Sequence, residues 1–348
     1  MIMVGAMIAA LWVIGWVMKV PRAARWNMTA ILLVAIMIAH VVLPDGHPFR
    51  MATGGDARLW AIIFGFGILV WGYRRILGAL RARVRSDNRT GGDPVRSDSF
   101  SPTELERYAR HIVLREVGGV GQRALKDAKV LVIGAGGLGA PVLQYLAAAG
   151  VGTIGLIDDD TVENANLQRQ VIHLDRNIDL PKVHSAAEVM RAQNPFVDVR
   201  PYQRRLTSEI AAELFGDYDI ILDGSDNFET RYLVNETAVR LGKPLIAAAL
   251  TQWEGQISVY DPANGAPCYA CVFPQAPDAG LVPSCAEAGV IGPLPGVLGS
   301  MMAVEAVKLI TGAGDPLRGR LHIYDALYAQ SRTISIGRRP DCAVCGNA

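Results

Sequence analysis

The stretch Lys129-Val-Leu-Val-Ile-Gly-Ala-Gly-Gly-Leu-Gly139 decides the fold of this chain. Its continuous apolar run predicts a buried parallel strand, and a glycine-rich turn follows the strand directly. An apolar helix over 141–149, a second strand over 153–157 and the acid Asp158 come next. Strand, glycine turn, helix, strand and acid in this order predict an α/β fold, a Rossmann-like doubly wound sheet with helices on both faces.

The glycine turn predicts nucleotide binding. Its glycines, Gly134, Gly136, Gly137 and Gly139, let the backbone approach a phosphate, and the following helix offers unpaired N–H groups at its N-terminus. Asp158 lies 22 residues beyond Gly136, about where an acid that binds ribose hydroxyls belongs. The turn does not distinguish NAD from ATP, so both nucleotides stay open on this evidence.

Charged residues beyond the turn favour nucleotidyl transfer over hydride transfer. Negative charge builds on phosphorus and on the leaving pyrophosphate, so such a site needs cations and Mg²⁺. Arg169 and Lys182 can supply positive charge. A predicted strand over 218–223 is followed by Asp226, whose carboxylate is a candidate Mg²⁺ ligand. Taken singly, each of these three residues is more typical of an ordinary loop charge.

Four of the five cysteines form two CxxC pairs, Cys268 with Cys271 and Cys342 with Cys345. This spacing is typical of a closed, tetrahedral structural zinc site. Disulfides and a redox-active pair are the alternatives. A cytoplasmic compartment disfavours stable disulfides, and no thioredoxin-like context that would indicate a redox-active pair surrounds either CxxC. The fifth cysteine, Cys285, stands in a segment rich in Pro and Gly. It is either a thiol on a mobile loop or a small buried residue, and the sequence leaves both readings open.

The first 75 residues contain three apolar runs, over 1–18, 28–43 and 60–72. A transmembrane helix needs about 20 apolar residues, so the first run fits and the other two need tilt or local thinning of the bilayer. We therefore expect about three transmembrane helices within residues 1–80, a flexible linker over 81–101 and a catalytic domain over 102–348. Buried core helices are the alternative for the second and third runs.

Lysine and arginine residues predict the orientation in the membrane. The first predicted loop carries Lys19, Arg22 and Arg25, and five arginines follow the third run over 74–85. The positive-inside rule then places the N-terminus outside and the catalytic domain in the cytoplasm. We expect a multi-pass protein of the inner (cytoplasmic) membrane. The net charge of +1 gives no reason to expect a nucleic-acid partner.

Residues 107–345 resemble the MoeB/ThiF/HesA family, which are bacterial relatives of ubiquitin-activating enzymes. The shared motifs occur in the family's order: Arg107-Tyr-Ala-Arg110-His-Ile, the GAGGLG turn, Asp-X-Asp-X-Val, Asn-Leu-Gln-Arg-Gln, Pro-Lys, Ser-Asp-Asn, Cys-X-X-Cys and Glu-Ala-Gly. The resemblance covers essentially the whole predicted catalytic domain. It implies an adenylyltransferase that uses ATP and Mg²⁺ to adenylate the C-terminal glycine of a ubiquitin-like sulfur-carrier protein, which prepares the carrier for thiocarboxylation.

The resemblance also implies roles for individual residues. Asp158 would bind the ribose, Asp226 would bind Mg²⁺, and Arg110 would reach across a homodimer interface to the ATP of the partner subunit. The residues that would hold the phosphates are Asn166, Arg169, Gln170 and Lys182. Cys285 would lie near the active site and either bond to the carrier or serve sulfur transfer. Because the sequence ends three residues after Cys345, we expect a separate sulfur donor that acts in trans.

Three other functions remain compatible with parts of the sequence. An NAD-dependent oxidoreductase would use the glycine turn and Asp158. A membrane-tethered binding protein could keep a vestigial adenylating site, although the combination of Arg169, Lys182 and Asp226 argues against it. An adenylating enzyme could also act on a tRNA base or a peptide instead of a sulfur carrier. The pathway that a carrier would serve, molybdopterin, thiamin or another, is not encoded in these motifs.

Overall fold

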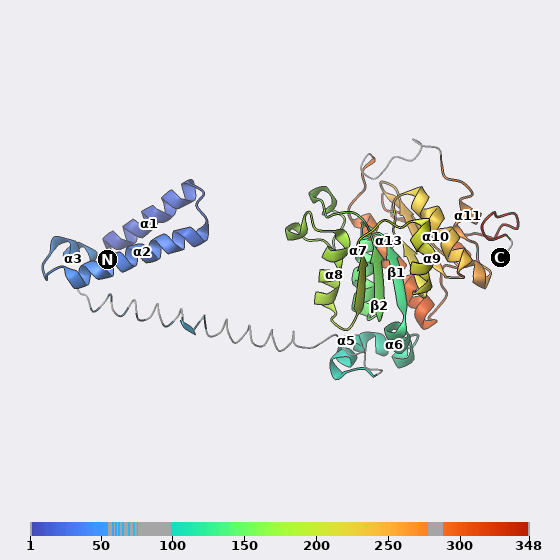
Figure 1. The fold of residues 1–348 in the computed structure, drawn as a ribbon, viewed down its shortest axis with the longest axis horizontal. Coiled ribbons are helices and arrows are strands. Elements are labelled where there is room, and N and C mark those ends of the chain that lie inside the picture. Colours follow the sequence, from blue (N-terminus) through green and yellow to red (C-terminus); the bar gives the residue numbers. More distant parts are fainter. Residues whose placement is uncertain are drawn as a thin grey trace. The chain divides into compact units, whose positions relative to one another are not determined.

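The chain separates into two compact units, Met1–Arg96 and Ser97–Ala348, in a computed structural model. The structure describes residues 2–54, scattered positions between 58 and 75, residues 99–277 and residues 288–346. The described part of the first unit is helical, and the second unit is built on one eight-stranded sheet (Figure 1).

Two helices of the first unit, α1 (Ile2–Val17) and α2 (Arg22–Val42), pack against each other, and the short α3 (Pro48–Thr53) follows. The indole Nε1 of Trp12 on α1 donates a hydrogen bond to Thr29 Oγ1 on α2 at 3.1 Å. The rings of Trp12 and Trp26 meet edge to face with centroids 5.2 Å apart. The 21 residues of α2 make a helix about 31 Å long, which matches the thickness of a bilayer's hydrocarbon core.

Among the described helices, two are long and apolar enough to cross a membrane, Ala24–Val42 within α2 and α13 (Pro293–Thr311). Helix α13 belongs to the core of the second unit, where Leu298 and Met302 are fully buried. Helix α2 is the better candidate, but length and composition alone are weak evidence for a transmembrane region. Most of the third predicted span, over 60–72, lies outside the described residues.

The prediction that Arg22 and Arg25 lie in the first loop is wrong. Both are in the first turn of α2, because Pro21 closes the turn after α1 and the helix begins directly behind it. The guanidinium of Arg25 donates from Nε to the carbonyl oxygen of Val20 at 3.0 Å and lies over the ring of Trp12. Of the three cations assigned to that loop, Lys19 is the one that remains in the turn.

The sheet of the second unit has the strand order β3-β2-β1-β4-β5-β6-β7-β8. Strands β1 to β5 pair in parallel, and β6, β7 and β8 extend the sheet with antiparallel pairs. The strands are β1 (Lys129–Ile133), β2 (Thr153–Ile157), β3 (Asp198–Tyr202), β4 (Ile220–Asp223), β5 (Leu245–Leu250), β6 (Glu254–Tyr260), β7 (Arg320–Asp325) and β8 (Gln330–Ser335).

Helices cover both faces of this sheet, so the predicted Rossmann-like α/β class is confirmed. The core on one face includes α7 (Gly139–Ala149), α8 (Lys182–Gln193) and α13, with α6 (Gly118–Asp127) packed on α13. The core on the other face includes α9 (Ser208–Gly216), α10 (Phe228–Arg240) and the single turn α11 (Tyr269–Val272) (Figure 1). The sequence did not predict the three antiparallel strands.

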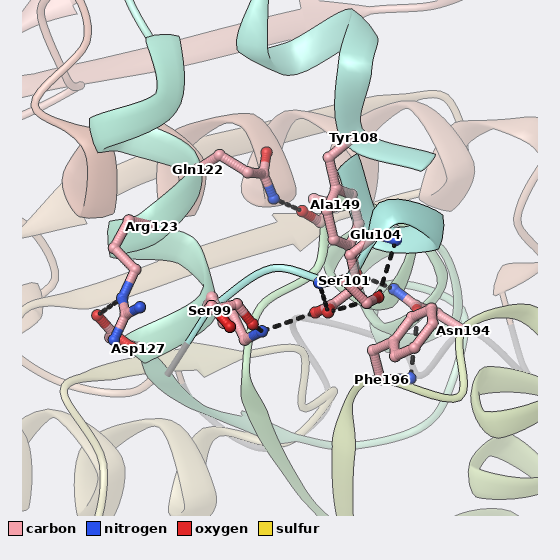
Figure 2. Close-up of polar contacts among 11 residues, drawn as sticks. Ser99, Ser101, Glu104, Tyr108, Gln122, Arg123, Asp127, Ala149, Asn194 and Phe196 are labelled. Carbon is pink, nitrogen blue, oxygen red and sulfur yellow. Dashed lines mark hydrogen bonds and ion pairs between the residues drawn. The ribbon is translucent and has the colours of Figure 1, made fainter. Parts of the chain in front are cut away.

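The unit begins with α5 (Pro102–Ile112), which is anchored at its first turn. Ser101 and Glu104 form a reciprocal capping box, and Lys126 Nζ on α6 pairs with the Glu104 carboxylate at 2.8 Å. Figure 2 shows the contacts between Ser101 and Glu104 together with Tyr108, whose hydroxyl accepts a hydrogen bond from Asn194 Nδ2 at 2.8 Å. Through these bonds, α5 is fixed to α6 and to the residue that ends α8.

Candidate active site

A cleft of about 1220 Å³ opens at the carboxyl ends of the parallel strands, where the strand order reverses between β1 and β4. Open α/β sheets bind ligands at this switch point. The cleft exceeds the usual volume of a small-molecule pocket, about 300–1,000 Å³. In the part of the chain that the structure describes, its wall carries ten charged residues: Asp158, Asp159, Asp160, Arg169, Lys182, Arg204, Arg205, Asp226, Arg231 and Glu254.

The glycine turn forms the floor of this cleft. Gly134 has a φ of +88°, a conformation that glycine adopts without strain, and its N–H donates to the carbonyl oxygen of Ile157 at 2.9 Å. A Cβ on Gly139 would overlap the carbonyl oxygen of Gly134. A Cβ on Gly136 would meet nothing closer than Gln170 Nε2, at 3.7 Å. The turn is therefore tightly packed at both ends and open toward the cleft in the middle.

Asp158 stands directly after β2 and accepts two backbone hydrogen bonds. Its Oδ2 accepts from the N–H of Ala135 at 2.8 Å, and its Oδ1 accepts from the N–H of Asp160 at 2.9 Å. Burial raises the pKa of Asp158, against the opposing effects of Lys182 and of these two N–H groups. The carboxylate is thus held in place at the edge of the cleft, where it can accept hydrogen bonds from ribose hydroxyls.

The structure brings Arg169, Gln170 and Lys182 to the cleft, as predicted for phosphate-binding groups. Lys182 is the first residue of α8, is nearly buried, and forms an ion pair from Nζ to Asp160 Oδ2 at 2.7 Å. The Oε1 atom of Gln170 is buried and has no hydrogen-bond partner among the described residues. Asn166 does not line the cleft and instead accepts a hydrogen bond from Arg169 Nη2 at 3.1 Å.

The loop after β4 places Asp226 at the cleft. Its shape comes from Asp223, the last residue of the strand, whose Oδ1 accepts from the N–H of Ser225 at 2.9 Å and from Ser225 Oγ at 2.6 Å. Asp226 is exposed, three residues beyond the strand, and the side chain of Asn227 caps α10 through the N–H of Thr230. The carboxylate of Asp226 is therefore accessible from the cleft, and the buried carboxylate of Asp223 is structural.

Arg231 is a site residue that the sequence analysis missed. It lies on α10, is 6% exposed and lines the cleft. Its Nη2 donates to the carbonyl oxygen of Ser225 at 2.5 Å, and its Nη1 has no hydrogen-bond partner among the described residues. A buried guanidinium with a free donor is a strong candidate to contact an anion. The one signal for Arg231 in the sequence is its position five residues after Asp226.

Two predicted site residues are not brought to this cleft. Arg110 is exposed in the last turn of α5 and does not line the cleft of its own subunit. Cys285 lies outside the described residues, as do all positions from 278 to 287.

The four cysteines of the two CxxC pairs come together next to α11, away from solvent. The Sγ atoms of Cys268 and Cys271 are 3.8 Å apart, those of Cys268 and Cys342 are 3.6 Å apart, and those of Cys271 and Cys345 are 3.4 Å apart. Four sulfurs bound tetrahedrally to one zinc ion at about 2.3 Å would be about 3.8 Å from each other. A disulfide would need about 2.05 Å. The thiol set therefore fits one tetrahedral metal ion and not a pair of disulfides.

The protonation of these thiols differs across the cluster. Burial raises the pKa of the Cys268 thiol. Burial also acts on Cys342, but hydrogen bonds from backbone N–H groups of Cys345 and Val344 and from neighbouring thiols outweigh it and lower the pKa of Cys342 to about 7. Metal binding has to displace the remaining protons, so affinity for a metal ion should rise with pH.

Curated proteins match this chain over about 250 residues. A sulfur carrier protein adenylyltransferase from Thermus thermophilus is 52% identical over 252 residues, which cover 71% of this chain and 93% of that protein. SAMP-activating enzyme E1 from Haloferax volcanii is 47% identical over 248 residues, which cover 71% of this chain and 91% of that protein. A probable adenylyltransferase/sulfurtransferase, MoeZ from Mycobacterium tuberculosis, is 50% identical over 247 residues, and the alignment spans 63% of its length.

Solved structures show the same fold. The crystal structure of E. coli MccB with MccA-N7isoASN matches with a TM-score of 0.62 and 26% identity, covering 69% of this chain and 75% of that one. The structure of E. coli MccB with ATP matches with a TM-score of 0.58, covering 66% and 70%. The ThiF family model matches residues 108–344. Together with these relatives, that match shows that the chain belongs to the ThiF family, as the motifs of the MoeB/ThiF/HesA adenylyltransferases indicate.

Proposed function

We propose that this chain uses ATP to adenylate the C-terminal glycine of a ubiquitin-like sulfur-carrier protein. The observation that carries the proposal is the 52% identity to a sulfur carrier protein adenylyltransferase over nearly that protein's whole length. The ThiF family match over residues 108–344 includes Asp158, Arg169 and Lys182. An NAD-dependent oxidoreductase would account for the glycine turn and Asp158, but it would have no use for cations gathered around a triphosphate.

The reaction needs positioning and charge more than a protein nucleophile. A carboxylate oxygen of the carrier attacks the α-phosphorus of ATP, and the bond from that phosphorus to the pyrophosphate oxygen breaks. The products are an acyl-adenylate and pyrophosphate. The glycine turn and the N-terminus of α7 present N–H groups to phosphate, and Asp158 accepts from the ribose. The later sulfur transfer, and any part of Cys285 in it, stays a prediction.

The charge balance of the cleft supports a requirement for a divalent cation. Among the residues that the structure describes, five acidic and five basic side chains line it, so their formal charges sum to about zero before ATP enters. Asp158 is engaged by two backbone N–H groups and Asp160 by Lys182, whereas Asp226 is exposed at the cleft wall. We assign Asp226 as the residue that would hold Mg²⁺, which neutralises triphosphate charge when bound.

A peptide substrate is the second candidate, and the solved structures to which this fold is similar include E. coli MccB with MccA-N7isoASN and MccB in complex with N-formylated MccA. The identity to MccB is 26%, half of the identity to the sulfur carrier protein adenylyltransferase. The sulfur carrier is therefore the better-supported substrate.

Removing either charge aimed at the phosphates should nearly abolish carrier-dependent ATP–pyrophosphate exchange. For Arg169→Ala and for Asp226→Ala we expect a loss of about 10²–10³ in rate, the usual cost of one preorganised electrostatic contact. Asp127→Ala is the matched control, because Asp127 makes an exposed ion pair with Arg123 outside the cleft, and its exchange rate should be unchanged. Near-normal exchange in both cleft variants would contradict the assigned mechanism.

We also propose that the four clustered cysteines hold a structural zinc ion. Purified protein should then contain about one zinc per chain, measured by elemental analysis, because four thiolates complete one tetrahedral site. Cys271→Ser should lose the metal and lower the melting temperature. Cys285→Ser is the control for replacing a cysteine as such, and it should keep the metal. A stable, metal-free protein would refute the zinc assignment.

For the first unit we propose a membrane anchor with the adenylating unit in the cytoplasm. Support comes from the exposed apolar side chains of α2, such as Trp26, Ile31 and Val41, and from the arginines over 74–85.

A topology reporter fused after Arg85 should therefore be active on the cytoplasmic side, and a reporter inserted between Asp45 and Asp56 should be external. The arginine-rich segment over 74–85 should stay on the cytoplasmic side of the membrane, and the loop one span earlier should then lie on the opposite side. A cytoplasmic signal from the insertion at 45–56 would rule out three spans.

We propose that the enzyme is a homodimer. A groove of about 840 Å³ on α7 and α13 is lined by exposed apolar side chains, among them Tyr145, Val171 and Val304, which a second copy could cover. Arg110, exposed outside the cleft of its own chain, is free to serve another subunit's site.

Sedimentation in detergent should give the mass of two chains. The double variant Tyr145→Glu/Val304→Glu should sediment with the mass of one chain, because both substitutions would bury a charge at the dimer interface. A monomeric mass for the unsubstituted chain would contradict the dimer.

A further inference from the structure

A buried histidine that does not line the cleft bonds to its floor. His173 is 5% exposed. Its Nε2 lies 2.9 Å from the carbonyl oxygen of Ala135 in the glycine turn, and its Nδ1 lies 2.9 Å from Ser185 Oγ on α8. Both partners are buried with it.

The partners of His173 define its tautomer. A carbonyl oxygen can only accept, so Nε2 carries the hydrogen and donates to Ala135. Nδ1 then accepts from the Ser185 hydroxyl, whose oxygen accepts in turn from Asn177 Nδ2 at 3.0 Å. Every polar atom along this chain has a partner when the imidazole is neutral. Burial, reinforced by the nearby positive charge of Lys182, lowers the pKa of His173 and favours that neutral form.

This chain of bonds joins three elements that carry predicted ATP-binding groups. The N–H of Ala135 donates to Asp158 and its carbonyl oxygen accepts from His173, so the peptide groups on both sides of Ala135 are fixed. Ser185 lies one turn after Lys182 on α8. The backbone N–H of His173 donates to the carbonyl oxygen of Gln170 at 3.0 Å. One imidazole therefore ties together the glycine turn, the segment of Gln170 and the helix of Lys182.

We propose that His173 is a positioning residue for ATP, which holds the glycine turn and α8 at the separation that one bound nucleotide requires. The proposal rests on the proposed ATP-dependent function. His173 acts through the Ala135 peptide, and through it Asp158, on one side and through the Ser185 contact to the Lys182 helix on the other. Because it touches neither the nucleotide position nor the carrier, its loss should weaken ATP binding and leave carrier binding alone.

The test measures equilibrium binding of ATP with Mg²⁺, and the KM values of carrier-dependent pyrophosphate exchange, on the purified full chain. For His173→Ala we expect the Kd and the KM for ATP to rise about tenfold or more, because two buried hydrogen bonds are lost and the Ala135 carbonyl is left unpaired. The KM for the carrier should not change. His173→Gln keeps an amide donor that can reach Ala135, and it should restore part of the affinity for ATP.

Two further variants separate positioning from general stability. Ser185→Ala keeps the imidazole and its bond to Ala135 but removes the link to α8, and it should raise the Kd for ATP about 2- to 10-fold, the range for one neutral hydrogen bond. It also serves if His173→Ala does not fold. His184→Ala replaces an exposed histidine that is next to Ser185 on α8, and it should leave the Kd for ATP unchanged.

The outcomes separate failure of the proposed role of His173 from failure of the proposed ATP-dependent function. If the unsubstituted chain binds no ATP, the proposed function fails. If the unsubstituted chain binds ATP, and folded His173→Ala and Ser185→Ala bind it equally tightly, only the role of His173 fails. A fall in kcat with both KM values unchanged would also overturn it, because that pattern reports a smaller folded fraction. An equal loss of affinity in His184→Ala would overturn it as well.

Discussion

The close approach of two backbone segments in the glycine turn is the constraint on which the site depends. The carbonyl of Gly134 faces the first turn of α7 with no room for a Cβ at Gly139. The same turn meets the loop after β4, since a Cβ on Gly134 would lie 3.1 Å from the carbonyl oxygen of Gly224. The register that pairs Ile133 with Asp223 sets this contact. The two loops that bear the glycine turn and Asp226 are thus placed by sheet register and close packing together.

Around this frame, polar groups of the cleft are already committed to one another. Lys182 pairs with Asp160, Asp223 holds Ser225, and Arg231 donates to the carbonyl of Ser225. Fixed groups of this kind stabilise a developing charge without reorganising during the reaction. The Lys182–Asp160 pair is the exception. A phosphate can attract Lys182 only in competition with that carboxylate, so nucleotide binding must exchange one anionic partner for another.

Features written locally in the sequence were predictable, and features made by tertiary contact were not. The first strand, the glycine turn, Asp158 and the two CxxC pairs depend on neighbouring residues, and the structure places each as expected. Arg231 and His173 act through partners that a local reading cannot supply. His173 meets a carbonyl 38 residues away. Arg231 bonds from the first turn of α10 to the carbonyl oxygen of Ser225, six residues earlier, and no sequence motif marks this bond. The antiparallel strands were missed because hairpin pairing at a sheet edge leaves no signal as strong as the glycine turn.

The helical turn α11 belongs both to the cysteine cluster and to the wall of the cleft. The cysteines can therefore support the site structurally, although adenylation itself needs no thiolate. Tyr269 lies between Cys268 and Cys271 on α11 and lines the cleft, with its ring 4.8 Å from that of Phe273. The backbone N–H of Tyr269 donates to Asn235 Oδ1 at 2.8 Å. Asn235 stands one turn after Arg231 on α10. A metal ion that fixes Cys268 and Cys271 therefore also fixes the turn against which the helix of Arg231 is bonded. If the cluster holds a metal ion as proposed, the C-terminal cysteine pair would support the cleft by holding this wall, while remaining outside the chemistry.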